Sequence, residues 1–250
     1  MSCPPRRSFV AGDARRPGQL ATVTDRRRST YLPGSAVQTS GATSLGLERA
    51  KVGRGQSSNA LPYSLKLAFT PDWVIRIDGD AWLRSRDAGD VTSGGGDTAF
   101  ILKRRFAIDD HSAFGLEGGV SLPTAGKTLG SGSHDLLING IFSSELGSEW
   151  QVDLNLFATR FGSSAMGLGR TETGWAAAAS RSAGERWELG AELSGTRRKG
   201  EGSTSQRLLS ASYALTRSTV WDIGFSHGLT SASPRWTVFT GVTFVALKLF

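Results

Sequence analysis

Two short motifs in the sequence have residue types that bind phosphate or attack an ester. Gly126-Lys127-Thr128 matches the end of a phosphate-binding P-loop, but that loop also needs a glycine at position 121, where the chain has Ser121. Residues 224–228 (GFSHG) fit the G-x-S-x-G pattern of a hydrolase nucleophile, which requires an acid and a histidine further along the chain. No Asp, Glu or His follows His227. Neither motif therefore predicts an enzyme.

The histidines and carboxylates give no stronger indication of chemistry. Three histidines share no spacing of the kind that binds zinc, namely His111, His134 and His227. Glu188 and Glu192 fall on one face of an expected strand, where paired carboxylates serve acid–base catalysis in some enzymes. Strand neighbours on a solvated face explain the pair better. The single Cys3 permits no internal disulfide, so the sequence predicts no catalytic residue, no metal and no cofactor.

The composition argues against two further classes of protein. Hydrophobic residues make up 38% of the 250, and no run approaches the roughly 18 consecutive apolar residues of a spanning helix. The net charge of +7 arises in residues 1–60, which hold 10 Lys/Arg and 3 Asp/Glu, whereas residues 61–250 hold 19 of each. Because most of the chain has no net positive charge to attract phosphates, we expect no nucleic-acid partner.

Alternation of apolar and polar residues is the main structural signal. In residues 149–161, Trp150, Val152, Leu154 and Leu156 share one parity, and mostly polar residues occupy the other, with Phe157 as the exception. A period of two indicates a strand with one apolar and one polar face. The same pattern predicts about twelve strands, at residues 43–51, 61–69, 73–84, 97–108, 112–123, 134–145, 149–161, 171–181, 185–197, 205–215, 219–228 and 236–246.

The connections between these strands alternate in length. Longer loops are expected near residues 52–60, 85–96, 124–133, 162–170, 198–204 and 229–235, with short turns between the other strand pairs. Five aromatic residues directly follow short turns, namely Trp73, Phe114, Trp150, Trp187 and Trp221. Alternating connections and a ring of aromatic residues at one end are typical of barrels in the outer membrane. The predicted fold class is therefore all-β, a transmembrane up-and-down antiparallel β-barrel of about 12 strands.

A soluble sandwich or lipocalin-like barrel would show the same alternation, with its apolar face inward. Strands of ten to thirteen residues favour the membrane barrel, since strands in soluble proteins are usually about five or six residues long. If the apolar parity faces lipid, arginine should damage the fold at Leu154 or Leu189 and should be tolerated at Glu192. The polar parity would then face the lumen, and it contains Arg76, Asp78, Asp80, Glu117, Asp153, Asn155, Glu188, Glu192 and Asp222.

Acidic side chains predominate in this lumen-facing set, which would favour passage of cations. A structural network, in which the acids neutralise Arg76 and other buried cations such as Arg207, is the alternative interpretation.

The chain divides into a basic N-terminal segment, residues 1–42, and the barrel, residues 43–250. The first segment contains Arg6-Arg7, Arg15-Arg16 and Arg26-Arg27-Arg28 and has no apolar core of a secretory signal peptide. Three interpretations stay open: a solvated basic tail, a misplaced start or frameshift that replaces a signal peptide, and an organelle transit peptide. We expect residues 1–40 to be dispensable for the fold.

Several stretches resemble a known family of outer-membrane barrels, the family named for the MetA pathway of phenol degradation and often called simply transporter. The resembling stretches are residues 115–126, 129–135, 212–216, 222–229 and 234–244. The resemblance implies an outer-membrane location and uptake of aromatic or other small organic compounds. It supplies no catalytic residues.

The favoured function is a passive channel or transporter for small organic solutes, aromatic ones among them, in the cell outer membrane. Its expected partners are the small-molecule solute, outer-membrane lipid and the barrel-assembly machinery. The alternative is a non-transport barrel that acts as an adhesin or a structural anchor. The expected loops of about seven to twelve residues are short for an adhesin.

Overall fold

The computed structural model describes residues 39–53, 55–87, 89–125, 129–147 and 149–249, and side chains within 41–244. None of these residues forms a helix long and apolar enough to cross a membrane. The strands are β1 (Thr39–Gly53), β2 (Gln56–Ala68), β3 (Trp73–Asp87), β4 (Asp90–Gly94), β5 (Thr98–Ala107), β6 (Ser112–Leu122), β7 (Asp135–Leu146), β8 (Trp150–Arg160), β9 (Thr171–Ala183), β10 (Trp187–Arg198), β11 (Thr204–Ala214), β12 (Thr219–Gly228) and β13 (Trp236–Leu249).

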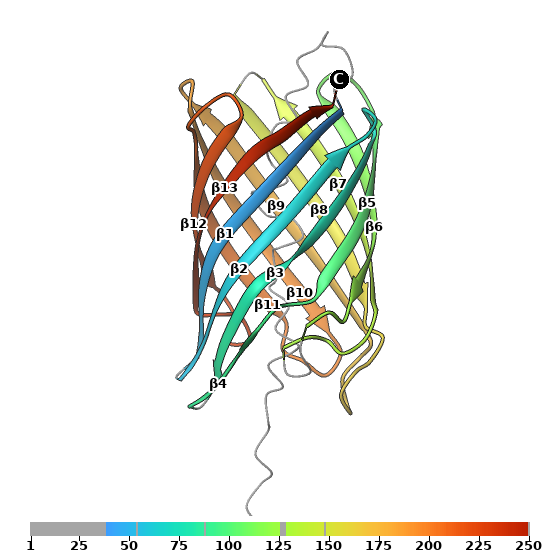
Figure 1. Cartoon of the computed structure of the whole chain (residues 1–250), viewed down its shortest axis with the longest axis vertical. Helices are drawn as coiled ribbons and strands as arrows, with labels where there is room; N and C mark the ends of the chain where they lie inside the picture. Colours follow the sequence, from blue (N-terminus) through green and yellow to red (C-terminus); the bar gives the residue numbers. More distant parts are fainter. Residues whose placement is uncertain (1–38, 54, 88, 126–128, 148, 250) are drawn as a thin grey trace, which may run out of the picture.

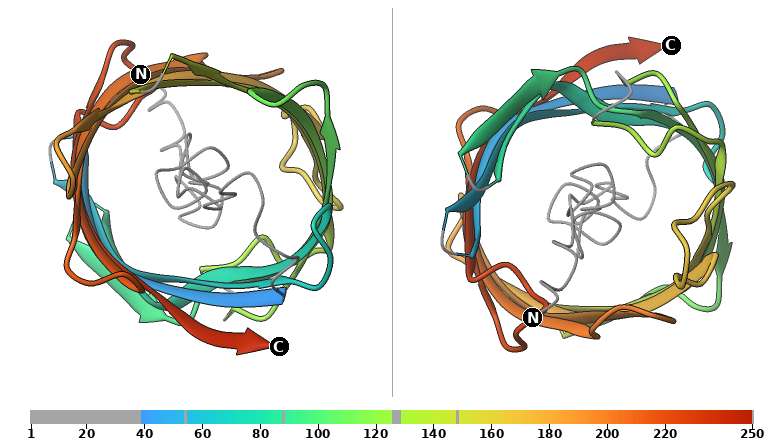
Figure 2. Two further views of the ribbon diagram at one scale, coloured as in Figure 1. Left: turned by 90° about the horizontal axis from the view of Figure 1, so that it is seen from above. Right: turned by 90° about the horizontal axis from the view of Figure 1, so that it is seen from below.

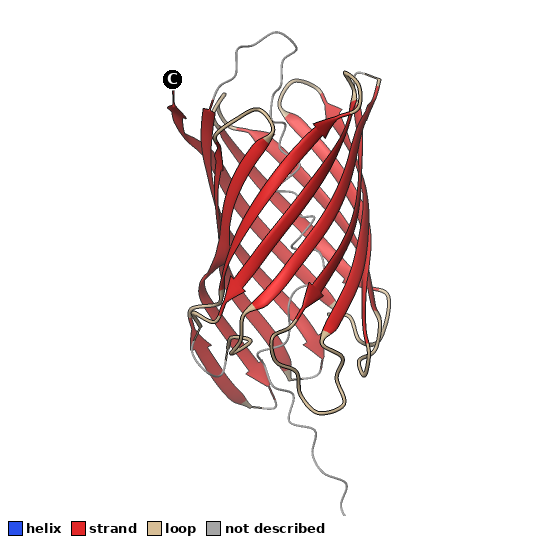
Figure 3. Cartoon of the chain, turned by 90° about the vertical axis from the view of Figure 1, so that its right-hand side faces the viewer, coloured by secondary structure: helices blue, strands red, loops and turns tan. Residues whose placement is uncertain are grey.

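Twelve of these strands close into one antiparallel barrel (Figures 1 and 2). From β5 to β13 each strand pairs with the next in the chain, and β13 closes the ring by pairing with β1. The pairs β1–β2, β2–β3 and β3–β5 complete the circle. The short β4 folds back on the loop end of β3 and takes no place in the ring. The predicted all-β barrel of about twelve strands is confirmed, with its strands strongly tilted to the axis (Figure 3).

The loops predicted at residues 52–60 and 85–96 are wrong. β2 already begins at Gln56, and the hairpin between β1 and β2 contains Gly55, whose positive φ of 78° suits a tight turn. The second predicted loop is mostly taken up by the end of β3 and by β4. In this part of the barrel both strand faces are polar, so the contrast that marks a strand in the sequence disappears. β1 also begins earlier than predicted, at Thr39.

The apolar side chains of the strands point outward. Leu154 and Leu156 are 46% and 72% exposed, whereas Asn155 between them is only 6% exposed. Large exposed apolar residues continue around the barrel, on β1, β5, β7, β10, β11 and β12. Water would oppose so large an apolar surface, and lipid hydrocarbon stabilises it. The predicted direction of the apolar parity is therefore confirmed.

Aromatic side chains lie on the outer surface at the short-turn end of the barrel. Trp150 and Trp187, each the first residue of its strand, are 47% and 43% exposed. The Arg181 guanidinium lies 5.5 Å from the Trp150 ring centroid and forms a 2.8 Å ion pair with Glu149. The Trp187 ring packs on Tyr213 at 4.8 Å between centroids. Such rings are favoured where lipid meets water, so this end lies at a membrane interface.

Side-chain hydrogen bonds close the short turn between β5 and β6. The Asp109 carboxylate accepts hydrogen bonds from the backbone amides of His111, at 2.8 Å, and Ser112, at 2.6 Å. The bond from the His111 amide is the largest cause that holds the pKa of Asp109 below its ordinary value of 3.8. The charged carboxylate therefore keeps stabilising this turn as the pH falls toward that value.

Candidate functional site

The polar parity of the strands forms the inner wall of the barrel. The nine polar residues singled out in the sequence all lie on the face opposite the exposed apolar side chains. Five are buried, namely Arg76, Glu117, Asn155, Glu192 and Asp222, and four are half-buried, namely Asp78, Asp80, Asp153 and Glu188. They come from five strands, namely β3, β6, β8, β10 and β12, so only some of them meet.

The structure brings four of these residues into one cluster, which we call the Glu117 cluster. Glu117, on β6, has no exposed surface, and its carboxylate lies 3.4 Å from Arg76 Nη1 and 3.7 Å from Lys103 Nζ. Asn139 Nδ2 donates to Glu117 Oε2 at 3.2 Å and lies 3.4 Å from Asn155 Oδ1. Arg76 Nε also donates to Asp78, at 2.7 Å. These contacts compensate the cost of removing the Glu117 charge from water.

We expect Arg76→Leu to lower the free energy of unfolding by about 3 kcal/mol, because it leaves the buried Glu117 carboxylate with fewer cationic neighbours. Adding Glu117→Gln to this variant should restore part of the loss, since a neutral amide needs no counter-charge. Urea titration of the protein refolded in lipid vesicles measures both effects. A double variant as unstable as the sum of its two single variants would mean that the two side chains do not interact.

Most of the described inner-wall cations lie on one side of the barrel, where they are accompanied by Asp78, Asp80 and Glu117. Four are on β2, β3 and β5, namely Lys66, Arg76, Lys103 and Arg105, and Arg198 lies at the loop end of β10. Carboxylates predominate on β8, β10 and β12, namely Asp153, Glu188, Glu192 and Asp222. β3 and β10 are six steps apart in either direction around the ring, so they face each other across the lumen (Figure 2). A solute between them would experience a field directed across the barrel.

Two sequence-based expectations about cations need correction. Arg207, which the sequence suggested as a buried partner for the acids, is exposed on the outer face of β11, where it alternates with the buried Leu208. Lys103 and Arg105 were overlooked, although they alternate with Leu102 and Phe106 in the sequence and so share the inner parity. That alternation was a sufficient signal to find them.

Two aromatic rings lie on the inner wall among polar side chains, and each covers a glycine of the neighbouring strand. Phe157, on β8, is 8% exposed, and its ring covers Gly174 of β9, where a Cβ atom would clash with it. The Phe239 ring covers Gly224 of β12 in the same way. Phe157 was the exception to the sequence alternation, and the structure explains it as an aromatic side chain on the inner face. The inner wall therefore offers aromatic as well as charged surface.

Arg198, on β10, contacts the loop between β8 and β9 at three points. Its guanidinium lies 3.9 Å from the ring centroid of Phe161. Its Nε donates to the carbonyl oxygen of Gly169 at 2.7 Å, and its Nη2 donates to Ser164 Oγ at 3.1 Å. The cation–π contact and the two hydrogen bonds fix the start and the end of this loop to β10.

Comparison with known proteins agrees with this architecture. No protein family model and no curated protein matches the sequence. The structure is similar to the COG4313 outer membrane channel from Pseudomonas putida F1, with a TM-score of 0.67 and 15% identity, covering 87% of this chain and 98% of that one. The chain has the fold of outer-membrane channels. It is similar also to the NanC porin, with a TM-score of 0.62 and 7% identity, covering 84% of this chain and 99% of that one.

A third solved structure, the KdgM porin, has a TM-score of 0.59 and 8% identity, covering 81% of this chain and 98% of that chain. The outward apolar surface and the interface aromatics are physical features of the same kind of protein. The barrel is therefore located in the cell outer membrane. Its short turns correspond to the periplasmic side of such barrels, and its longer loops to the outside of the cell.

Of the two motifs that suggested chemistry, the structure describes residues 224–228. Residues 224–228 lie within the straight strand β12 and its end, where Ser226 is buried and no helix follows, so the hydrolase arrangement is absent there. Residues 126–128 lie outside the described residues. His111 and His134 are exposed. Within the described part of the chain, no group of three or more His, Cys, Asp or Glu side chains is placed to hold a metal ion.

Proposed function

We propose that this barrel is a passive channel for small organic solutes, aromatic compounds among them. One observation carries the proposal: the inner wall combines the aromatic rings of Phe157 and Phe239 with charged side chains of both signs. An aromatic acid or phenol has the matching chemistry, an apolar ring with a polar substituent. The resemblance of the sequence to the family named for the MetA pathway of phenol degradation supports the same class of solute.

Liposome swelling tests this proposal. Vesicles that contain the refolded protein should swell faster than empty vesicles when small sugars or the sodium salts of aromatic acids are added outside. Replacing Ser210, a half-buried inner-wall residue of β11 whose strand partners are Gly190 and Gly224, with tryptophan should slow the swelling because the indole narrows the passage. All variants should first show the heat-modifiable gel band of a folded barrel.

The adjacent Ala211 provides the matched control. It lies on the same strand with its side chain outward and half-exposed, so Ala211→Trp places an indole on the lipid side. Swelling should then equal that of the original protein. Swelling no faster than that of empty vesicles, for every solute, would contradict a channel. It would favour the second candidate function, a barrel that serves as a structural anchor or adhesin.

A further inference from the structure

Four basic side chains gather on the outer surface at the loop end of β1 and β3. Pairing places Arg49 and Arg84 on either side of Asn59 in one row, and Lys51 and Arg86 in the next row toward the loops. Adjacent strands lie about 4.8 Å apart, so the two columns of cations are about 10 Å apart. All four share the parity of the exposed leucines of β1. We call these four residues the basic patch.

The basic patch has no counter-charge on its own surface. Among the described residues, no carboxylate lies on the outer face of β1, β2, β3, β4 or β13, because the acids of these strands have the inner parity. At the opposite end of the barrel, outer-face cations have partners: Arg181 pairs with Glu149, and Arg104 stacks on Trp73 at 5.2 Å. Four clustered cations repel one another, and a bound anion would remove that repulsion.

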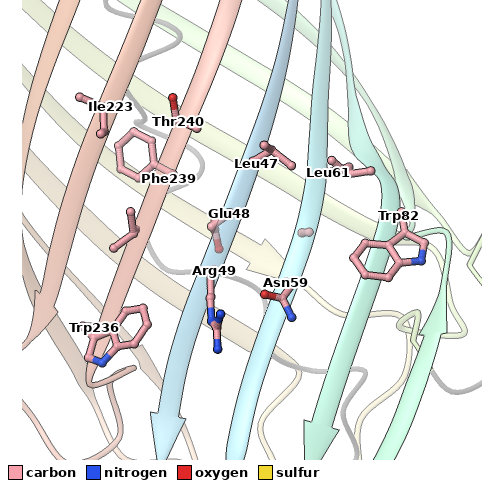
Figure 4. A pocket seen from close by; sticks show the side chains of 12 residues that line it. Leu47, Glu48, Arg49, Asn59, Leu61, Trp82, Ile223, Trp236, Phe239 and Thr240 are labelled. Atoms are coloured by element: carbon pink, nitrogen blue, oxygen red, sulfur yellow. The ribbon is translucent and has the colours of Figure 1, made fainter.

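An apolar groove begins where the basic patch ends. It has a volume of about 640 Å³ and opens on the outer face of β12, β13, β1, β2 and β3 (Figure 4). Its walls include Leu47, Leu61, Ile223 and Val238, with Trp82 and Trp236 on its two sides. Arg49 and Asn59 line its loop-side part, so they belong to both the groove and the patch row. Glu48, which has the inner parity, is also part of the lining. The apolar groove and the basic patch are therefore continuous.

The geometry points to this groove and the basic patch as a binding site for a phosphorylated glycolipid of the outer leaflet, of the lipid A type. Such a lipid has its acyl chains in the hydrocarbon of the membrane and its phosphate groups in the headgroup region. The outer surface of the barrel has the matching order, with leucines first and cations nearer the loops. The planar guanidinium groups of Arg49, Arg84 and Arg86 match phosphate oxygens in bidentate fashion. Trp82 and Trp236 flank the groove on its two sides (Figure 4), and their amphipathic rings are of the kind favoured where lipid meets water.

Single outward arginines elsewhere at this end provide a comparison. Arg160 on β8 and Arg207 on β11 are exposed on the outer face, one per strand and on the other side of the barrel ring from β1–β3. They have the charge of the basic patch residues without the groove or the clustering. If anionic lipid were attracted to any exposed cation, the basic patch and the pair of Arg160 and Arg207 would contribute equally. Binding at a specific site would depend on the basic patch alone.

Native mass spectrometry of the full chain in detergent, titrated with bisphosphorylated lipid A, tests this assignment. The protein should retain one lipid A molecule, and Arg49→Gln with Arg84→Gln should weaken its binding about tenfold, equivalent to about 1.4 kcal/mol. Arg160→Gln with Arg207→Gln, which removes the same charge, should change it less than about twofold, or about 0.4 kcal/mol. Leu47→Trp, which fills the groove without changing the charge, should also weaken binding.

Two further ligands separate a lipid site from a site for free anions. Phosphatidylglycerol, with chains and one phosphodiester, should bind more weakly than lipid A, and inorganic phosphate should not compete at millimolar concentration. If the two double arginine variants lost the same affinity for lipid A, the proposed site would be refuted. Equal affinity for phosphatidylglycerol, or displacement of lipid A by inorganic phosphate, would also refute it.

Discussion

Leu209→Arg should destabilise the folded barrel by about 2–4 kcal/mol, the usual cost of arginine near the middle of the bilayer on the lipid face. Leu209 lies in the middle of β11 and is 64% exposed, so its side chain contacts lipid hydrocarbon. Arginine at this position must keep its charge in that medium or distort the bilayer around it. The urea concentration at which half the protein is unfolded in vesicles should fall accordingly.

The next residue along the strand is the matched control. Ser210 has the inner parity, is half-buried and is paired with Gly190 on one side and Gly224 on the other, so Ser210→Arg meets little side-chain bulk from these two neighbours. We expect a much smaller loss of stability. Tolerance of arginine at Leu209 together with unfolding by Ser210→Arg would mean that the apolar face is the interior of a soluble protein.

The structure changes which inner residue is suitable as that control. The sequence suggested Glu192, on the same polar parity as Ser210. Glu192 is only 4% exposed, so an arginine there would have to displace packed neighbours of the wall. Leu154→Arg and Leu189→Arg remain valid lipid-face changes, since these leucines are 46% and 51% exposed. Parity was readable from the sequence, but the space around each inner residue was not.

The fold was predictable because lipid on one side and a polar lumen on the other impose a strict period of two. β12, predicted at residues 219–228, has those limits in the structure. Prediction failed where this contrast is lost, at the loop ends of β1, β2 and β3, where outward residues such as Arg49, Asn59 and Arg84 are polar. Those strand ends extend past the hydrocarbon into the headgroup region, where both faces meet polar surroundings.

The candidate site was predictable in composition and not in arrangement. Parity gave nine candidate lumen-facing residues, yet it could not tell that Arg76 and Lys103 both approach Glu117. That contact depends on the pairing of β3 with β5 and of β5 with β6, which sets the stagger between strands. The opposition of β3 and β10 depends on closure of the ring, a property of the whole chain. Local sequence carries no signal for either.

The carboxylates of β8, β10 and β12 should make the channel prefer cations. On the side of β3 and β5, Arg76 and Lys103 already neutralise Glu117, so this side adds little net negative charge. On the opposite side, Asp153 accepts hydrogen bonds from Ser143 and Gln151, which are neutral and bring no positive charge. Rings or walls of Asp and Glu favour cations in pores of other proteins.

A planar bilayer with a salt gradient measures this preference as a reversal potential. Glu188→Gln with Glu192→Gln should move the ratio of cation to anion permeability toward one, because both carboxylates lie on the inner wall of β10. Glu149→Gln with Glu185→Gln removes the same charge from exposed turn residues and should have a smaller effect. The preference should also weaken as salt rises from 0.1 to 1 M, since the screening length falls from about 10 Å to about 3 Å. Anion preference in the unchanged protein, or an equal effect of the two double variants, would refute control of selectivity by the β10 carboxylates.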